Sequence, residues 1–323
     1  MGDQEQNKPL VYIVILNWNN APDTVECLSS LLALDYPNYH TLVVDNGSTD
    51  NSVSKIKASQ PSVEILETGS NLGYAEGNNV GIRQAIEAGA QYVLVLNNDT
   101  LVDPSMVTEL VNFAETHPEA GMVGPLMYCE DPRNILFATG SFIQWAQGKT
   151  WHRDMFQPAK PHSNLGKPEK VDFITGCGVL VRRELIETAG VLNSEYYLNF
   201  EDVEWCVRAR RNGFEVWYVP QAILWHKVSA SLGQSSPANT YYMTRNALLF
   251  FGQNAPINVR WLSILRIIMR TLRAIGAWSI LTTYKNEQFR RLRQANLLAL
   301  RDFLLGRFGQ MGADVTAVCY SVK

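Results

Sequence analysis

Short apolar runs alternate with polar, helix-like segments over residues 10–125 of this 323-residue chain. The runs are rich in Val, Ile and Leu, as strands buried on both faces of a sheet are. We predict strands at Leu10–Leu16, His40–Asp45, Val63–Glu67 and Gln91–Leu96 and helices at 21–34, 50–59, 74–88 and 104–116. Strands that alternate with helices indicate βαβ crossovers, so the predicted fold class is α/β with a Rossmann-like, mostly parallel central sheet.

Each predicted strand ends in polar residues. The four segments are Asn17-Trp18-Asn19, Asp45-Asn46-Gly47-Ser48, Asn71 to Gly73 and Asn97-Asn98-Asp99. One such segment would be ordinary turn chemistry, because Asn, Asp and Gly suit turns. The carboxyl ends of parallel strands share one edge of the sheet, where ligands of open α/β folds bind. Four polar segments at that edge therefore predict a ligand site.

Beyond residue 125 the pattern is less regular. Residues 126–170 are typical of a strand-and-loop insertion, and a strand with "TGCG" inside it is predicted at Val171–Arg182. Helices are predicted at 183–189 and 201–212, and "GFEVWYVPQAILWH" is predicted to form two short strands.

The C-terminal part differs in charge from the rest. The net charge is −3, but residues 256–323 hold eleven Lys and Arg against three Asp and Glu, a balance of +8. Arg266, Arg270 and Arg273 fall on one face of an apolar helical segment. One interior charge costs about 2.5 kcal/mol or more at the centre of a bilayer, so three argue against spanning. An amphipathic helix at a membrane interface and a surface helix with its Arg face in water both fit.

Composition and cysteine usage bear on class and compartment. Charged residues are 18% of the chain and hydrophobic residues 46%, which argues against disorder. The five cysteines form no CxxC pair, and the first ten residues do not resemble a signal peptide. We therefore expect a cytoplasmic protein, peripheral at the inner face of the membrane if the tail binds lipid.

Several side chains at the predicted edge suit catalysis. Asp99 is a hard oxygen donor with amide oxygens beside it, as Mg²⁺ or Mn²⁺ prefers. Asp45 can accept hydrogen bonds from a ligand's N–H or hydroxyl groups. Glu201 and Asp202 open a predicted helix, where they either interact with the helix dipole or supply a general base, with Asp202 as the candidate.

Two further residues have structural and functional interpretations. His226 ends an apolar strand and is either a structural histidine or part of a metal shell. Arg245 either binds phosphate with its planar guanidinium or pairs with an acid at a helix surface.

Taken in this order, the segments resemble family 2 glycosyltransferases of the GT-A fold, within them the bacterial rhamnosyltransferase-like group, over about residues 10–255. The resemblance implies a GT-A domain at 8–255, a helical basic extension at 256–323, a nucleotide-diphosphate sugar donor, a divalent cation, and inversion by direct displacement. The acceptor would be a glycan or a lipid-linked sugar, in cell-surface polysaccharide synthesis, with peripheral membrane contact through 258–310.

Site residues follow by position in that family. The donor nucleotide would contact Asn17, Trp18, Asn19, Asp45, Asn71, Gly73, Asn97 and Arg245, and the metal would contact Asp99 and His226. Asp202, beside Glu201, is the expected base, and Thr175 and Gly176 would border the acceptor. Asn97-Asn98-Asp99 stands where the family has DxD, so one carboxylate is replaced by an amide and Asp99 is left as the direct ligand.

Other classes fit less well. A sugar-nucleotide nucleotidyltransferase would carry a Gly-rich basic loop after its first strand, where this chain has "LNWNNAPDT". A dehydrogenase would need the GxGxxG fingerprint. A catalytically inactive nucleotide-sugar-binding subunit stays open, although the Glu201-Asp202 pair argues against it. The acidic body without a recognition motif argues against nucleic acid.

Overall fold

The computed structural model describes residues 8–159, 166–227 and 236–320. The chain forms two compact units that interleave along the sequence. Unit 1 comprises Met1–Phe142, His152–Leu192 and Trp205–Val228. Unit 2 comprises Ile143–Trp151, Asn193–Glu204 and Ser229–Lys323.

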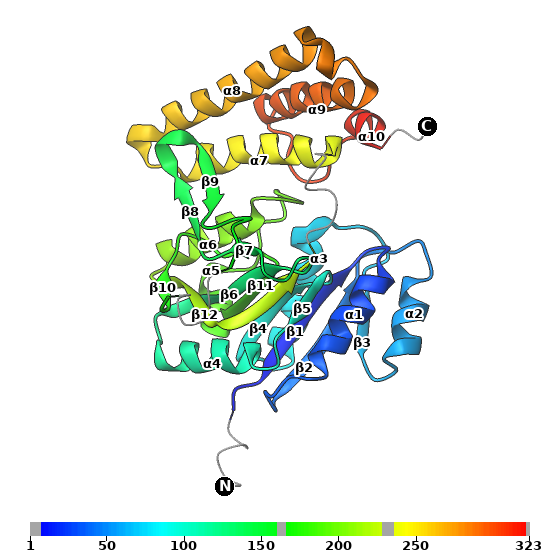
Figure 1. Cartoon of the computed structure of the whole chain (residues 1–323), viewed down its shortest axis with the longest axis vertical. Coiled ribbons are helices and arrows are strands. Elements are labelled where there is room, and N and C mark those ends of the chain that lie inside the picture. The colour runs from blue at the N-terminus through cyan, green and yellow to red at the C-terminus, as the bar shows by residue number, and fades with distance from the viewer. Residues whose placement is uncertain (1–7, 160–165, 228–235, 321–323) are drawn as a thin grey trace. The chain divides into compact units, whose positions relative to one another are not determined.

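The centre of unit 1 is a parallel sheet, as the sequence predicts (Figure 1). β1 (Val11–Asn17) lies between β2 (Tyr39–Asp45) and β4 (Tyr92–Asn97), and β3 (Glu64–Glu67) pairs with β2. The register aligns Asn17 with Asp45, and Leu16 with Asn97. Because these strands run in the same direction, their polar ends meet at one edge.

The rest of the sheet extends beyond β4 in the order β11, β6, β12 and β10. β11 (Gly178–Arg182) is antiparallel to β4 and β6 (Ala120–Cys129), whereas β12 (Glu215–His226) is parallel to β6. The prediction of two short strands at residues 213–226 was wrong. One strand runs through, with register shifts at Glu215/Val216 and Val219/Ile223.

Shorter strands complete the sheet of unit 1. β5 (Thr100–Val102) and β10 (Glu169–Lys170) pair with β12, and β7 (Leu136–Ala138) pairs with β6. The predicted strand at Val171–Arg182 is shorter than expected, since only β11 is regular strand.

Helices cover both faces of this sheet (Figure 1). They are α1 (Ala21–Leu31), α2 (Ser52–Ser59), α3 (Gly73–Glu87), α4 (Met106–Thr116), α5 (Arg183–Ala189) and α6 (Glu201–Arg211), the last of which begins in unit 2. α3 packs closely because it carries glycine: a Cβ on Gly81 would lie 2.4 Å from Val14 and 2.8 Å from Val44. The sheet core is fully buried, as the apolar runs predicted.

Unit 2 is mainly helical. It contains α7 (Pro237–Asn254), α8 (Ile257–Ile280), α9 (Glu287–Leu304) and α10 (Ala313–Cys319), and α7 packs on both α8 and α9. The buried cluster between α7, α9 and α10 includes Tyr241, Tyr242 and Val315. α7 therefore belongs to unit 2, and this division differs from the boundary predicted at residue 255.

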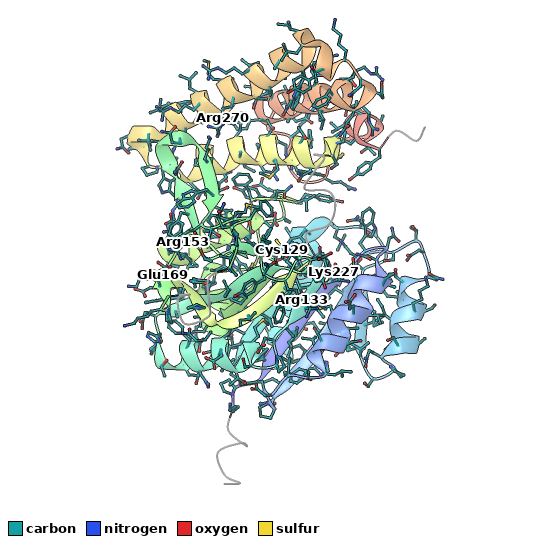
Figure 2. All side chains as sticks on the ribbon, in the orientation of Figure 1. Cys129, Arg133, Arg153, Glu169, Lys227 and Arg270 are labelled. Carbon is teal, nitrogen blue, oxygen red and sulfur yellow. The ribbon has the colours of Figure 1, made fainter. Side chains whose placement is uncertain are left out.

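A hairpin tip also belongs to unit 2. β8 (Ser141–Gln144) and β9 (Lys149–His152) are joined by a 3₁₀ turn at Trp145–Gln147. Arg266 donates to the Ala146 carbonyl at 2.8 Å, and Arg270 (labelled in Figure 2) donates to the Gln147 carbonyl at 2.6 Å. These two arginines of the predicted face therefore bind the hairpin rather than projecting into water.

Candidate active site

The ends of β1 and β2 form the first part of the site. Asn17 is fully buried, and its amide donates to Asp45 Oδ1 at 2.8 Å, while its Oδ1 accepts from Thr24. The Asp45 carboxylate also accepts from the Ser48 hydroxyl at 2.6 Å and the Ser48 N–H at 2.9 Å. Three of about four acceptor directions of Asp45 are thus used within the protein. Asn17 and Ser48 fix the carboxylate, which leaves little of it for a ligand.

The residues after Asn17 link the first two loops. Asn19 adopts a left-handed backbone (φ 52°), and its side-chain oxygen accepts from the Thr49 N–H at 2.8 Å. Its own N–H donates to Ser48 Oγ at 2.9 Å. Trp18 between them is 48% exposed, so its indole face is open to a planar ligand.

Asn46, which lies in one of the predicted polar segments but was given no role of its own, shapes the third loop. The Asn46 amide donates to Asn71 Oδ1 and to the Gly73 carbonyl, and its oxygen accepts from the Leu72 N–H. Gly73 has φ 82° and begins α3. Asn46 is 2% exposed and therefore acts on the loop rather than on a ligand. The sequence signal that could have indicated this role of Asn46 was its position directly after Asp45, at the end of a predicted strand.

Tyr74 connects the donor side of the predicted site to the acceptor side. Its hydroxyl lies 2.9 Å from Asn97 Oδ1 and 2.8 Å from the Gly176 carbonyl. A Cβ on Gly176 would lie 2.5 Å from that hydroxyl, so glycine permits this approach. Thr175 is buried and donates to Met127 Sδ at 3.4 Å. Gly176 thus adjoins Asn97, whereas the Thr175 side chain is directed into the core.

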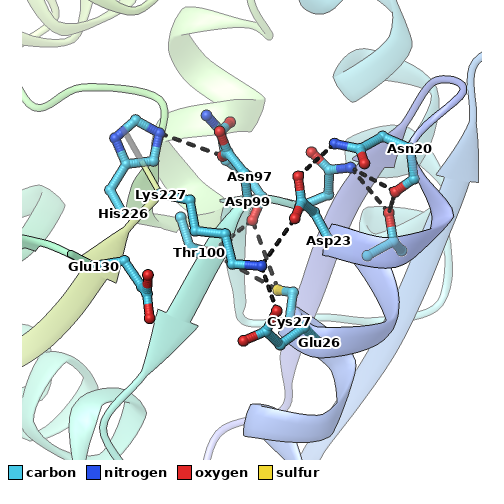
Figure 3. Close-up of polar contacts among 12 residues, drawn as sticks. Asn20, Asp23, Glu26, Cys27, Asn97, Asp99, Thr100, Glu130, His226 and Lys227 are labelled. Atoms are coloured by element: carbon cyan, nitrogen blue, oxygen red, sulfur yellow. Dashed lines mark hydrogen bonds and ion pairs between the residues drawn. The ribbon is translucent and has the colours of Figure 1, made fainter. Parts of the chain in front are cut away.

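Asp99 and His226 meet because β5 pairs with β12, which places Thr100 opposite His226 (Figure 3). Asp99 Oδ1 lies 3.3 Å from His226 Nε2, and the two side chains are 23% and 13% exposed. This distance is that of an ion pair, but Asp99 Oδ1 is buried and no described residue gives it a hydrogen bond of good geometry. A carboxylate oxygen that is buried and unsatisfied indicates a ligand position.

The surroundings of His226 favour a positive charge next to Asp99. Burial lowers the pKa of His226, but the Cys177 sulfur, 3.7 Å away, and the Asp99 carboxylate raise it by more, to about 11. The Phe137 ring packs edge-on against the imidazole, with centroids 4.9 Å apart. To ligate a metal, His226 would first have to lose its proton.

The donor set fits a divalent cation that arrives with a phosphate ligand. Among the described residues, no group of three or more His, Cys, Asp and Glu side chains forms a metal cluster. Mg²⁺ is commonly bound through one or two carboxylates together with substrate phosphates. Asp99 meets this requirement, with His226 as the neighbouring side chain.

Lys227 closes this part of the site and was also missed in the sequence. Its N–H donates to the Asp99 carbonyl at 2.8 Å, and its ammonium group pairs with Asp23 at 2.9 Å and with Glu26 (Figure 3). Burial lowers the pKa of Lys227, but hydrogen bonds to the two carboxylates raise it overall. The ion pairs of Lys227 with Asp23 and Glu26 therefore join the end of β12 to α1.

The predicted base lies in unit 2. Asp202 is partly exposed at the start of α6, and its carboxylate accepts from the Val203 N–H at 2.7 Å. Glu201 is 5% exposed, and its Oε2 has no hydrogen-bond partner among the described residues. Burial raises the pKa of Glu201, and the neighbouring Asp202 charge raises it further, which favours the protonated acid. Of the two, Asp202 is the group suited to accept a proton.

The structure does not support the predicted role of Arg245 in binding the diphosphate. The side chain is fully buried in unit 2, where it donates to the Gly309 carbonyl at 2.9 Å and to Asn246 Oδ1 at 3.0 Å. The guanidinium also lies over the Tyr242 ring, 4.9 Å from its centroid. Arg245 is therefore a structural residue of α7.

A mostly parallel α/β sheet gathers Asn17, Asp45 and Asn97 at its carboxyl edge, where open α/β folds bind their ligands. The sequence profile of "Glycosyl transferase family 2" matches residues 12–190, more than half of the chain. The chain belongs to this family, which confirms the predicted family and fold class, and it is a glycosyltransferase.

Similar proteins include two rhamnosyltransferases and one solved structure. N-acetylglucosaminyl-diphospho-decaprenol L-rhamnosyltransferase of Mycobacterium tuberculosis is 29% identical over 256 residues, 74% of this chain and 82% of that protein. The dTDP-rhamnosyl transferase RfbF of Shigella flexneri is 25% identical, over 86% of this chain and 90% of that protein. The mannosyltransferase PcManGT of Pyrobaculum calidifontis, solved with GDP-Man and Mn²⁺, has a TM-score of 0.57 at 15% identity, over 94% of this chain and 89% of that chain. The last comparison shows the fold alone.

Proposed function

We propose that this chain transfers a sugar, rhamnose being the first candidate, from a nucleotide-diphosphate donor to a hydroxyl of a lipid-linked glycan acceptor, with inversion at the anomeric carbon. The observation that carries the proposal is the buried, unsatisfied Asp99 carboxylate oxygen at the carboxyl edge of the parallel sheet. The two rhamnosyltransferase relatives support the sugar, and the name of the mycobacterial relative supports a diphospho-lipid acceptor.

The donor would be held by unit 1. The exposed Trp18 ring would stack on the base, and Asp45, buried and bonded to Asn17 and Ser48, would chiefly fix the loops that border it. Asn71 and Gly73 would lie by the sugar-nucleotide, and Asn97 would border the sugar opposite Gly176. Asp99 would hold Mg²⁺ or Mn²⁺ together with the donor's phosphates, and His226 would join it as a ligand only after losing its proton. The cation would supply charge stabilisation for the departing diphosphate.

The chemistry proposed for the chain's own residues is a single displacement. Asp202 accepts the proton of the acceptor hydroxyl as that oxygen forms its bond to the anomeric carbon. The bond from this carbon to the diphosphate oxygen breaks, and its electron pair leaves with the nucleoside diphosphate. Burial and the neighbouring Asp202 charge raise the pKa of Glu201 and so favour its protonated form, which leaves Asp202 as the base.

The test is transfer from dTDP-, UDP- and GDP-sugars to a polyprenyl-diphosphate-linked acceptor, with Mg²⁺, Mn²⁺ or EDTA. We expect one donor to be used, and Asp202→Asn to lower turnover about 10²- to 10⁴-fold. Asp314→Asn, an exposed acid in the first turn of α10, is the matched control. Full turnover in Asp202→Asn would refute the base assignment. No turnover of any donor would favour an inactive binding subunit.

The acceptor proposal includes peripheral contact with an anionic membrane surface through α8. Trp261, Leu265, Met269 and Leu272 are spaced along one side of α8 and are 75%, 55%, 43% and 49% exposed. α8 contains no Asp or Glu. Beside the apolar side lies an open groove of about 410 Å³ whose basic lining residues are Lys149, Arg266, Arg270 and Arg273.

Arg266 and Arg270 are held by hairpin carbonyls. Lys149 and Arg273 are the basic residues left beside the apolar side, and they suit a bilayer with anionic headgroups, since the stem of a basic side chain can lie along the apolar region. A second copy of α8 would instead bring like charges together. No described helix combines the length and the apolar character needed to cross a bilayer.

The membrane contact is tested by flotation of the protein with vesicles of phosphatidylcholine alone or with phosphatidylglycerol. We expect binding only with the anionic lipid, and its loss in Trp261→Ser/Leu265→Ser but not in Leu304→Ser, a control that is 78% exposed on α9. Dimers that disappear in the same double variant, without vesicle binding, would refute the membrane contact.

A further inference from the structure

The backbone that precedes Glu201 and Asp202 is unusual. Residues 195–200 form a loop between Asn193 and α6, and Tyr197, Asn199 and Phe200 have φ of 63°, 69° and 73°. Left-handed backbone is disfavoured for side chains other than glycine, and this loop contains no glycine. Such backbone persists only where the surrounding structure stabilises it, and it is enriched at functional sites.

Asn246 of α7 supplies that stabilisation from within unit 2. Its Nδ2 lies 2.7, 2.8 and 2.9 Å from the carbonyl oxygens of Tyr196, Leu198 and Asn199, which share its two N–H donors. These three acceptors lie within four consecutive residues of the loop, so one amide group binds most of its length. Asn246 is fully buried, so water does not compete for these hydrogen bonds.

Arg245 sets the orientation of that amide. Its Nε donates to Asn246 Oδ1 at 3.0 Å, and its Nη2 reaches the carbonyls of Glu195 and Tyr196 at 3.5 and 3.4 Å. Arginine only donates and backbone carbonyls only accept. The Asn246 oxygen must therefore face Arg245 and its nitrogen must face the loop.

The loop is continuous with the first turn of α6. The Phe200 carbonyl accepts from the Glu204 N–H at 2.9 Å, and the Phe200 ring packs near Phe250, with centroids 5.6 Å apart. A change in the backbone of the loop therefore changes where α6 begins and how the Asp202 carboxylate is directed.

We infer that Arg245 and Asn246 are positioning residues which hold the strained 195–200 loop so that Asp202 is presented as the base. This inference rests on the proposed function for the role of Asp202, and on the structure alone for the hold on the loop. Arg245 and Asn246 would thus affect the reaction through the loop, without contacting the substrate.

The test compares Asn246→Ala with Asn296→Ala. Asn296 is also a buried amide of unit 2, 4% exposed, but its hydrogen bond is with Thr244, from which it accepts, rather than with the carbonyls of the loop. We expect both variants to lose stability, and only Asn246→Ala to lose kcat, by about 10- to 100-fold, with the KM for the donor unchanged. Equal kcat in the two variants would overturn the inference.

Arg245→Lys is the alternative variant for this test if Asn246→Ala does not fold. Lysine keeps the charge but has no Nε–H in the position that orients the Asn246 amide. We expect a smaller loss of kcat, again at constant KM, and an unchanged kcat would overturn the inference.

Hydrogen exchange of residues 195–200 separates failure of this inference from failure of the proposed function. If Asp202→Asn keeps full turnover, the base assignment is refuted. Faster exchange of the loop in Asn246→Ala than in Asn296→Ala would still support the hold on the loop, and equal exchange would refute it.

Discussion

Asp99 of unit 1 and Arg245 of unit 2 are both charged side chains held largely out of water, yet their surroundings differ. Arg245 is fully buried, and backbone carbonyls, a neighbouring amide and aromatic rings surround its guanidinium. Asp99 has a buried oxygen that receives no hydrogen bond of good geometry from the described residues. Desolvating a charge costs free energy, which protein partners offset at Arg245 but only partly offset at Asp99.

The same contrast extends to the two regions around these residues. At the sheet edge, polar side chains fix one another and leave selected groups open, namely the Trp18 ring and the Asp99 carboxylate. In the 195–200 loop, the carbonyls bound by Asn246 are satisfied inside the protein. Substitutions at the first region should therefore change activity, and substitutions at the second should change stability as well.

Of the substitutions that test this contrast, Asp99→Asn should give the largest loss of activity. Replacing the carboxylate by an amide weakens cation and diphosphate binding, and we expect kcat/KM for the donor to fall about 100-fold or more. The urea midpoint should change little, because the amide removes a poorly hydrogen-bonded buried oxygen charge but also its ion pair with His226.

Asn98→Ala is the control for Asp99→Asn. The Asn98 amide donates to Thr24 at 2.9 Å and so faces α1. We expect at most a few-fold loss of kcat/KM. A loss as large as that of Asp99→Asn would contradict the assignment of Asp99 as the direct ligand.

Arg245→Met should give the largest loss of stability. It leaves the buried Asn246 Oδ1 and the partly buried Gly309 carbonyl without their Arg245 donors, at about 1–3 kcal/mol each, so we expect the free energy of unfolding to fall by about 3 kcal/mol or more. Urea unfolding measures this. Arg290→Met removes an exposed ion pair with Glu287 and should leave the midpoint unchanged.

Glu201→Gln should alter the pH dependence of stability. Because the pKa of Glu201 is raised by burial and by Asp202, the wild-type protein loses stability as the pH rises above the range where the unfolded side chain ionises. The glutamine variant lacks this loss, so its melting temperature should exceed that of the wild type increasingly from pH 5 to pH 8. Parallel curves for the two proteins would show that Glu201 ionises normally.

The central sheet was predictable from sequence because each of its strands is a separate apolar run followed by polar residues. β1 to β4 occur where the pattern predicted them, within one or two residues. β12 was not predicted as one strand, because Pro220 and Gln221 interrupt the apolar pattern while the ladder with β6 continues past them through a register shift.

Contacts between residues far apart in the sequence were harder to predict than the positions of the strands. Asp99 and His226 were both proposed as metal ligands, but only the β5–β12 ladder brings them to 3.3 Å. Arg245 was assigned to phosphate because arginine commonly binds it. No local pattern shows that the distant Gly309 carbonyl and the 195–200 loop bind its guanidinium. Tyr74 was missed because its partners, Asn97 and Gly176, are 23 and 102 residues away.

Lys227→Met should give the smallest effect, since it removes a partly exposed ion-pair group at the edge of the site. Its ammonium group bonds Asp23 and Glu26, and its side chain is 23% exposed. Exposed pairs contribute about 0–1 kcal/mol, so we expect the KM for the donor to rise less than about fivefold. The Lys227 N–H that bonds the Asp99 carbonyl belongs to the backbone and is retained.

The pKa of Asp23 provides a second measurement in the same variant. Burial alone would raise this pKa, but hydrogen bonds from Lys227 and Asn20 hold it below its usual value. It should therefore rise in Lys227→Met, as carboxyl NMR titration would show. If kcat/KM fell about 100-fold, as expected for Asp99→Asn, Lys227 would itself act on the donor. Lys227 would then belong with Asp99 among the charges that bind the ligand, and not with the charges that are satisfied within the protein.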